Sequence, residues 1–311
     1  MKWEKRGVVF APAEGHSWIT KYAQIPVADV LDDGIVRIYF GTRDEQNRTS
    51  TGFVEVEAAN PSRILRVSDR PALSPGRIGT FDDSGAMPSC VVTVGGRKYL
   101  YYIGWNRGVT VRYHNAIGVA VSDDGGTTFE RLFEGPVMDR THLEPFFVVT
   151  PFVTVEGGLW RMWYCGCTGW QIEGGITEPR YQIRYAESAD GIVWRRANTV
   201  CIDYRADDEA NTRPCVVRDG GNYRMWYSYR SIRGYRTDPR QAYQLGYAES
   251  TDGVRWERFD GRAGLCRSDE GWDSEMVAYP FIYTYDCRWY MLYNGNGFGQ
   301  SGIGYAVLEQ D

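Results

Sequence analysis

Short apolar and aromatic runs alternate with polar turns along the whole chain, which is the pattern of β-strands rather than of helices. The most aromatic runs read IVRIYFG, RKYLYYIG, LWRMWYCG, NYRMWYS and RWYMLYNG, and each follows a shorter apolar run that holds a proline. Turn sequences such as DDG, VGGR, VEGG and RDGG separate the two runs of a pair. The sequence therefore predicts an all-β chain built from antiparallel hairpins.

The prolines of the first runs mark an internal repeat with a period of 62 to 66 residues. They are Pro26, Pro88, Pro151, Pro214 and Pro280. Within a unit, a third run such as QIRYAES and a turn such as SADGIVW lead to a fourth strand. Sheets of four antiparallel strands repeated around an axis are the blades of a β-propeller, so we predict a single five-bladed domain spanning residues 1–311.

The N-terminus resembles the end of a unit. The sequence KWEKR at 2–6 is similar to VRWERF at 254–259, and the last unit stops after its third strand at Gly302–Val307. We expect the N-terminal strand to supply the missing fourth strand and so to leave no unpaired sheet edge. In that case Trp3 takes the register of the aromatic residues of the other fourth strands, which are Phe129, Trp194 and Trp256.

Composition and charge narrow the classes of function. The 311 residues carry 35 Lys and Arg against 40 Asp and Glu, and this net charge of −5 disfavours binding to nucleic acid or to an anionic membrane. The first residues hold no apolar signal-peptide core, and we expect a cytoplasmic protein. Seven cysteines are an odd count that we interpret as reduced thiols. Neither a cofactor nor a metal is predicted, and the oligomeric state stays open.

Candidate catalytic groups lie in the segments that lead into the first strands. Counting five residues back from each proline gives Lys21, Asp83, Phe146, Glu209 and Glu275. Side chains two apart on a strand share a face, so without a β-bulge the three acids would converge at the mouth of the central channel.

Glu144 lies two residues further out than the phenylalanine of its segment. Repulsion among acids in one cavity raises the pKa of at least one of them, which allows an acid and a base to coexist. We predict Asp83, Glu144, Glu209 and Glu275 as catalytic acids and bases; the alternative is that they cap turns or pair with arginines.

Candidate substrate-binding residues follow from the same geometry and from the long loops after the second strands. They are His16, Trp18, Lys21, Trp105, Arg107, His142, Arg180, Arg213, Arg230, Asp273 and Tyr279. Aromatic rings stack on sugar faces, and guanidinium groups suit carboxylates and phosphates, so a uronate, a sugar phosphate or a nucleotide-activated sugar fits the pattern. Blade packing and solvated loop charge are the competing interpretations. His16, His142, Glu144 and Asp83 could together bind a divalent metal, but we expect hydrogen-bonding roles.

The repeat, the hairpins AESADGIVW and AESTDGVRW and the segment GWDSEMVAYP at 271–280 resemble the five-bladed propeller glycosidases. That group includes the arabinanase/β-xylosidase, invertase/levansucrase and mannoside phosphorylase types. The turn SDDGGTTF at 122–129 is similar to the Asp-box hairpin of sialidase-type propellers, a structural motif. The resemblance implies a carbohydrate-active fold, but the positions that it assigns to catalytic acids hold Ile25, Met87 and Val149. The chain therefore looks like a divergent member.

Two classes of function remain open. The first is a glycoside hydrolase-like enzyme acting on the glycosidic bond of an anionic or phosphorylated sugar, with the four carboxylates as acid and base. The second is a propeller that binds a glycan or a protein without catalysis; a glycosyl transferase or phosphorylase on the same scaffold is a further alternative. Fold alone cannot choose among them, because propellers host many unrelated functions.

Overall fold

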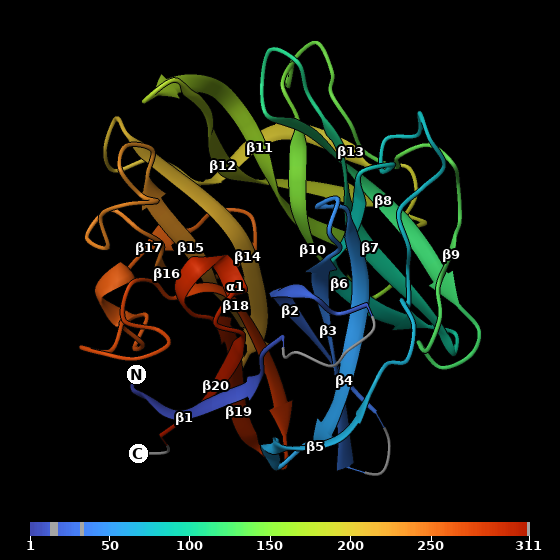
Figure 1. Ribbon diagram of the computed structural model, residues 1–311, viewed down its shortest axis with the longest axis vertical. Coiled ribbons are helices and arrows are strands. Elements are labelled where there is room, and N and C mark those ends of the chain that lie inside the picture. The colour runs from blue at the N-terminus through green and yellow to red at the C-terminus, as the bar shows by residue number, and fades with distance from the viewer. Residues whose placement is uncertain (13–17, 32–33, 310–311) are drawn as a thin grey trace.

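The computed structural model describes residues 1–12, 18–31 and 34–309, and β-strands dominate it (Figure 1). One antiparallel sheet consists of β10 (Val148–Glu156), β11 (Leu159–Glu173), β12 (Ile176–Ser188) and β13 (Arg195–Ile202). A second consists of β14 (Glu209–Asp219), β15 (Asn222–Ser231), β16 (Gln244–Ser250) and β17 (Glu257–Arg258). A third consists of β18 (Ala278–Tyr285), β19 (Arg288–Asn294), β20 (Ile303–Leu308) and β1 (Trp3–Phe10).

The remaining strands form two further antiparallel groups. The first holds β2 (Lys21–Val30), β3 (Ile35–Arg43), β4 (Thr49–Glu57) and β5 (Asn60–Val67). The second holds β6 (Gly85–Val94), β7 (Arg97–Arg107), β8 (Tyr113–Ser122) and β9 (Glu130–Arg131). One parallel pair, Thr49 with Gly85, joins the two groups into an eight-stranded sheet. In the described part of the chain, the short helical turns η2 (Asp260–Arg262) and α1 (Asn296–Gly299) lie in loops.

The first strand of each group lies near the centre of the molecule (Figure 1). In the described part of the chain β2 contacts β6, β6 contacts β10, β10 contacts β14, β14 contacts β18, and β18 returns to β2. These strands are mostly buried, because each has neighbouring groups on both faces. The chain thus circles a common centre, which confirms the nearly all-β propeller type of fold.

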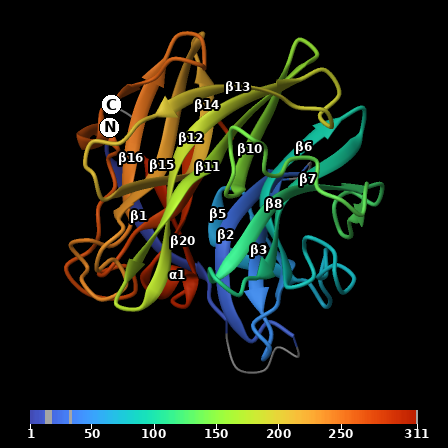
Figure 2. The same ribbon diagram turned by 90° about the horizontal axis from the view of Figure 1, so that it is seen from above.

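The N-terminal strand completes the last sheet, as the sequence predicted. β1 pairs antiparallel with β20, with Trp3 opposite Leu308, and β1 lies beside β20 in both views (Figures 1 and 2). The backbone N–H of Glu309 donates to the carbonyl of Lys2 at 3.0 Å, so the two ends of the chain are held together.

The ring of Trp3 packs on the preceding group, as its counterparts do. It meets Trp226 edge-on with ring centroids 5.8 Å apart. The counterparts are Phe129 against Tyr39 at 5.6 Å, Trp194 against Tyr101 at 5.9 Å and Trp256 against Trp163 at 6.4 Å. Aromatic contacts of this kind add about 0.5–1.5 kcal/mol each beyond the area that they bury, so they bind each group to its neighbour.

The predicted Asp-box turn is also present. The Ser122 hydroxyl donates to Asp124 at 2.7 Å and accepts from the N–H of Gly126 at 2.8 Å, while Asp124 accepts from the N–H of Thr128. The turns at Ser188–Asp190 and Ser250–Asp252 repeat the first of these bonds. These residues therefore build hairpins at the outside of the groups and are structural.

A β-bulge accompanies the proline of each first strand. Because a bulge interrupts the alternation of faces, counting residues back from the proline does not show on which face an acid lies. The register shifts between Gln24 and Val27 and at the matching places in β6, β10, β14 and β18. Proline cannot donate to the ladder and is tolerated at such irregularities. The prediction of one shared face is wrong, because Asp83 and Glu275 lie in turns ahead of their strands whereas Glu209 opens β14.

Candidate functional site

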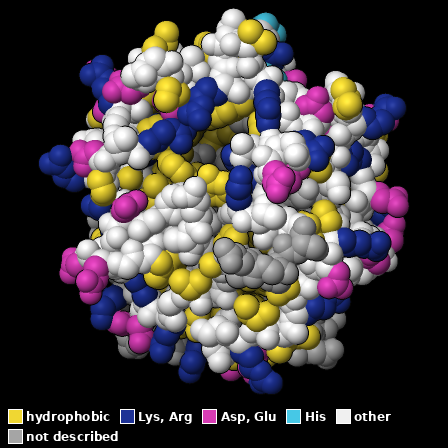
Figure 3. Space-filling model, in the orientation of Figure 1, with side chains coloured by type: hydrophobic (Ala, Val, Ile, Leu, Met, Phe, Trp, Pro, Cys, Tyr) yellow, Lys and Arg dark blue, Asp and Glu magenta, His cyan; other side chains and the backbone are white. Residues whose placement is uncertain are grey.

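A cavity of about 620 Å³ opens among the inner strands and the loops of one rim. Figure 3 shows a hollow near the middle of that face, with Lys and Arg side chains around it. Its described lining has four arginines, Arg43, Arg107, Arg112 and Arg236, and nine rings, Tyr22, Trp105, Tyr113, Phe147, Tyr181, Tyr235, Tyr243, Tyr279 and Phe298. Amides and hydroxyls come from Gln24, Asn47, Asn115, Thr150 and Thr212, and aliphatic surface from Ile25, Met87, Ile103 and Val149. We call this space the central cavity.

Arg43 lies at the end of β3, and none of the ion pairs among the described residues includes it. Its guanidinium carbon lies 5.2 Å from the ring centroid of Tyr22 and 5.8 Å from that of Trp105. Its Nε is buried and has no hydrogen-bond partner among the described residues. Burial lowers the pKa of Arg43, and the positive charge of Arg112 adds to that effect. An anion in the central cavity would relieve this cost.

Arg112 and Arg236 share one buried carboxylate. Glu178 on β12 lies 2.8 Å from Nε of Arg236 and 3.2 Å from Nη1 of Arg112, and it accepts the hydroxyl of Tyr235. Burial raises the pKa of Glu178, but the hydrogen bonds from Arg236 and Tyr235 outweigh it and hold that pKa below its usual range. The cluster of Arg112, Arg236 and Glu178 therefore carries two positive charges and one negative charge, and its net charge is positive.

Two further arginines are buried, Arg230 on β15 and Arg213 on β14. Arg230 is 2% exposed, and it donates from Nε to the hydroxyl of Tyr243 and from Nη2 to that of Tyr181, both at 3.2 Å. Those two hydroxyls are 2.8 Å apart. Arg213 is fully buried and donates to the carbonyls of Ser89 at 2.8 Å and Pro26 at 3.1 Å, tying β14 to β6 and β2. Burial lowers the pKa of Arg213 to about 10.

The four predicted catalytic acids are not part of the described lining of the central cavity. Glu144 is buried away from it among bases. It is 3% exposed, and its carboxylate accepts from the hydroxyl of Tyr164 on β11 at 3.0 Å and from Arg196 on β13 at 2.7 Å. Arg184 on β12 lies 3.4 Å away. The carboxylate therefore joins its lead-in segment to three strands of one sheet.

The same device recurs in two other groups, and a branched form of it in a third. We call it a latch: an acid at the entry to the first strand, a tyrosine of the second strand and a base of the outermost strand. In β6–β9 it is Asp82 with Tyr102 at 3.0 Å and Arg131 at 2.7 Å. In the last sheet it is Asp273 with Tyr293 at 3.1 Å and Lys5 of β1 at 2.6 Å. For Glu144, the pairing with Arg196 and Arg184 favours the competing interpretation, in which the predicted acids pair with arginines.

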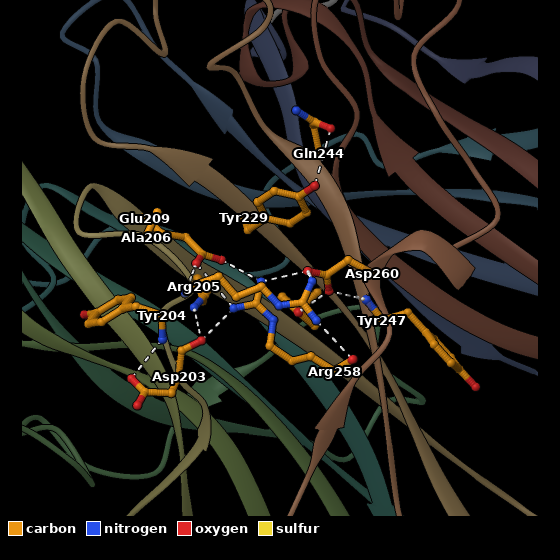
Figure 4. Close-up of polar contacts among 12 residues, drawn as sticks. Asp203, Tyr204, Arg205, Ala206, Glu209, Tyr229, Gln244, Tyr247, Arg258 and Asp260 are labelled. Atoms are coloured by element: carbon orange, nitrogen blue, oxygen red, sulfur yellow. Dashed lines mark hydrogen bonds and ion pairs between the residues drawn. The ribbon is translucent and has the colours of Figure 1, made fainter.

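Glu209 belongs to a branched latch (Figure 4). Its carboxylate lies 2.6 Å from Arg258 of β17, and Arg258 also contacts Asp260 at 2.8 Å. Tyr227 donates to Asp260 instead of to Glu209. Arg205 pairs with Asp260 at 2.8 Å. Two acids and two bases therefore form one connected network.

Asp83 and Glu275 stand outside the latches. Partial burial opposes ionisation of Asp83, but hydrogen bonds from Asn106, Gly79 and Ser84 hold its pKa below the usual range. Glu275 is exposed, and only its backbone N–H has a partner that the structure shows, Asn296. Neither residue is part of the described lining of the central cavity. The catalytic role of all four acids stays a prediction.

Some of the predicted binding residues lie at the central cavity, and the others lie elsewhere. Trp105, Arg107 and Tyr279 line the central cavity, and Arg230 hydrogen-bonds to two of its tyrosines. Lys21 pairs in register with Arg43 and is exposed. His16 lies outside the described residues. The others have different surroundings: Trp18 packs over Gly52, His142 is exposed, Arg180 stacks on Tyr204, Arg213 binds inner-strand carbonyls and Asp273 forms a latch.

Three arginines of the lining, Arg43, Arg112 and Arg236, were not among the predicted binding residues. Two lining tyrosines were also missed: Tyr181 lies within β12, and Tyr243 directly precedes β16. Within the described part of the chain, no three His, Cys, Asp or Glu side chains gather as metal ligands, and no helix there could span a bilayer.

The chain is closely similar to two mycobacterial proteins. It is 41% identical over 310 residues to "Uncharacterized protein MT1551" of Mycobacterium tuberculosis strain CDC 1551 / Oshkosh, which covers 99% of this chain and 100% of the relative. It is 40% identical over the same length to "Uncharacterized protein Rv1502" of strain ATCC 25618 / H37Rv, with the same coverage. The chain belongs to the family of these two proteins. No family model matches it.

Solved structures share the fold at low identity. An RGII complex of BT0996 has a TM-score of 0.77 and 19% identity, over 99% of this chain and 92% of that one. A thermostable family-43 glycoside hydrolase gives 0.68 and 16%, over 97% and 94%. A structure named for the GH130 family of mannoside phosphorylases, which "contains glycoside hydrolases", gives 0.66 and 15%, over 99% and 93%. At these identities the likeness shows the propeller-type fold alone.

Proposed function

We propose that the protein is a single-domain, five-bladed propeller that binds an anionic sugar in the central cavity and acts on the bond at its anomeric carbon. The observation that carries the proposal is Arg43, whose guanidinium carbon lies 5.2 Å from the ring centroid of Tyr22 and 5.8 Å from that of Trp105, and whose buried Nε has no partner among the described residues. The fold shared with proteins named glycoside hydrolases supports a carbohydrate as the ligand. The apolar residues at the positions of the resemblance's acids, Ile25, Met87 and Val149, support a divergent member.

The composition of the cavity wall suits both parts of the proposed ligand, the sugar ring and the anionic group. Tyrosine and tryptophan rings offer flat apolar faces to a sugar, and their polar atoms remain available for hydrogen bonds. The arginines provide charge that the described carboxylates do not fully neutralise. A guanidinium in a partly enclosed, low-dielectric space attracts a carboxylate or phosphate more strongly than one in bulk water. A volume of about 620 Å³ lies in the range of small-molecule sites.

A ligand panel with two arginine variants tests the proposal. We expect glucuronate, galacturonate and hexose phosphates to raise the melting temperature, whereas neutral hexoses and methyl hexosides do not, since binding to the folded state alone stabilises it. Arg43→Gln should weaken the affinity for the anionic sugars by about tenfold or more, on the order of one charge-assisted hydrogen bond.

The matched control is Arg77→Gln, because the Arg77 side chain is 75% exposed and pairs with Glu134 on the surface. Its affinity should equal that of the wild type. Stabilisation by neutral sugars alone, or equal losses in the two variants, would refute the proposed site.

A further inference from the structure

Two tyrosine hydroxyls of the central cavity share one hydrogen bond. Tyr181 on β12 and Tyr243 directly before β16 both line the cavity, and their hydroxyl oxygens are 2.8 Å apart. Each hydroxyl has one proton, so one tyrosine donates to the other, and the proton of the second is not used between them. We call these two residues the tyrosine pair. The pair therefore has one proton that it can present to a ligand in the cavity.

A buried guanidinium holds both oxygens of the tyrosine pair. Arg230 on β15 is 2% exposed, and it donates from Nε to Tyr243 and from Nη2 to Tyr181, both at 3.2 Å. Its other described hydrogen bonds go to two backbone carbonyls, at 2.9 and 3.2 Å. The ring centroid of Tyr235 lies 3.7 Å from its guanidinium carbon. The hydrogen-bond partners of this buried charge are neutral oxygens, so a negative charge that forms beside it is stabilised.

The tyrosine pair meets the two requirements for a general acid. Such a group must carry its proton at the working pH, and its anion must be stabilised once the proton has left. Burial raises the pKa of Tyr181 well above the ordinary phenol value, so the hydroxyl is protonated at neutral pH, while the charge of Arg230 acts in the opposite direction. Arg230 therefore stabilises the phenolate that remains after proton transfer. Tyrosine is one of the side chains that enzymes use in this way.

We propose that the tyrosine pair donates the proton that the leaving oxygen takes up when the bond at the anomeric carbon breaks, and that Arg230 is the positioning residue behind the pair. This inference rests on the proposed function and specifies its proton transfer. It assigns to the pair the acid role that the sequence suggested for one of four carboxylates. Arg43 binds the anionic group of the sugar, and the pair faces the leaving oxygen.

Atoms and electrons balance with water as the co-reactant. The bond between the anomeric carbon and the leaving oxygen breaks, and its electron pair stays on that oxygen, which takes the proton of one phenol. The phenolate remains beside Arg230. A water oxygen then forms the new bond to the anomeric carbon, and a proton of that water returns to the phenolate. The tyrosine pair is thereby restored for the next turnover.

Leaving groups of different basicity test the proton donor. The substrates are the α- and β-anomers of methyl and 4-nitrophenyl glucuronide and galacturonide, with the full chain as the enzyme. Methoxide is strongly basic and needs a proton in order to leave, whereas 4-nitrophenolate leaves without one. Tyr181→Phe and Tyr243→Phe should each lower kcat for a methyl uronide by about a hundredfold or more. Both variants should lower kcat for the 4-nitrophenyl uronide much less.

A third tyrosine supplies the matched control, Tyr185→Phe. Tyr185 lies on β12 like Tyr181, but its hydroxyl donates to Glu187 at 3.0 Å, and it is not part of the described lining of the cavity. This variant should turn over both kinds of uronide as the wild type does. Arg230→Lys keeps the charge but loses the fork, so it should also reduce turnover of the methyl uronide more than that of the 4-nitrophenyl uronide. Unchanged melting temperatures would show that the variants fold.

The outcomes separate this inference from the proposed function. Equal losses for the two leaving groups, or wild-type turnover of methyl uronides by both phenylalanine variants, would overturn the inference and leave the anionic-sugar site intact. Turnover of 4-nitrophenyl uronides alone by the wild type would do the same. Calorimetric binding of uronates without turnover of any uronide would overturn the inference and the catalytic part of the proposed function. Absence of both binding and turnover would overturn the proposed site as well.

Discussion

The latches and the central cavity use the same residue types in opposite ways. In the latches of Glu144 and Asp273 each carboxylate is at most 3% exposed and has a base within 2.7 Å. In the cavity Arg43 has no described acid, and Arg112 and Arg236 share one. The chain has a net charge of −5, yet the described wall of its cavity is positive. Local pairing, and not the overall charge of the chain, therefore decides the sign of the charge that the described cavity wall presents.

Repetition separates the two regions further. The latch acids occur in four groups, and the tyrosine that meets most of them stands at the same place on the second strand, as Tyr102, Tyr164, Tyr227 and Tyr293 do. The first group carries Phe40 there and has no acid in the described lead-in residues 18–20. Residues that recur with their partners are part of the architecture, whereas Arg43 and Trp105 have no such series.

Removal of the N-terminal strand should have the largest effect. Deleting residues 1–10 takes Lys5 from Asp273 and Trp3 from Trp226, and it leaves β20 unpaired along its edge. We expect loss of cooperative unfolding, since these contacts are a large part of a domain's stability of about 5–15 kcal/mol. Thermal melts followed by near-ultraviolet circular dichroism measure it.

The point variant Arg6→Ala is the control, because Arg6 pairs only with exposed Glu4 on β1 as far as the structure describes. It should melt like the wild type. A truncated chain that unfolds as sharply and at the same temperature would show that closure of the last sheet is dispensable.

Breaking one latch should be the next largest effect. Glu144→Gln keeps the shape of the side chain but leaves Arg184 and Arg196, 11% and 16% exposed, without their counter-charge. We expect a loss of about 3 kcal/mol in the free energy of unfolding. The affinity for an anionic sugar should not change. Urea denaturation and calorimetry measure the two quantities.

Exposed Glu275 supplies the matched variant, Glu275→Gln, which should alter neither stability nor affinity. If Glu144→Gln or Glu275→Gln instead loses turnover while its stability stays normal, the acid is catalytic and the comparison between latches and cavity fails.

Much of this architecture is predictable from the sequence, because strand periodicity and the repeat are local signals. Trp3 could be placed in the last sheet since its neighbours copy an interior strand. The acids could not be placed by counting, because bulges at the prolines break the alternation of faces. Their partners also come from distant strands: Lys5 is 268 residues from Asp273. Arg43 could not be selected from the sequence, because its lack of a partner among the described residues depends on every side chain around it.

The smallest effect is expected from the latch tyrosine alone. Tyr164→Phe removes one hydroxyl that donates to Glu144, while Arg196 at 2.7 Å and Arg184 remain in place. The carboxylate stays paired, so we expect a loss of about 1 kcal/mol, the usual value of one buried hydrogen bond. Urea denaturation of Tyr164→Phe, Glu144→Gln and the double variant measures the coupling. If the hydroxyl acts only through the carboxylate, the double variant should lose less than the sum of the two single losses. Simple additivity would show that Tyr164 stabilises the sheet independently, and the latch would then reduce to an ion pair between Glu144 and its arginines.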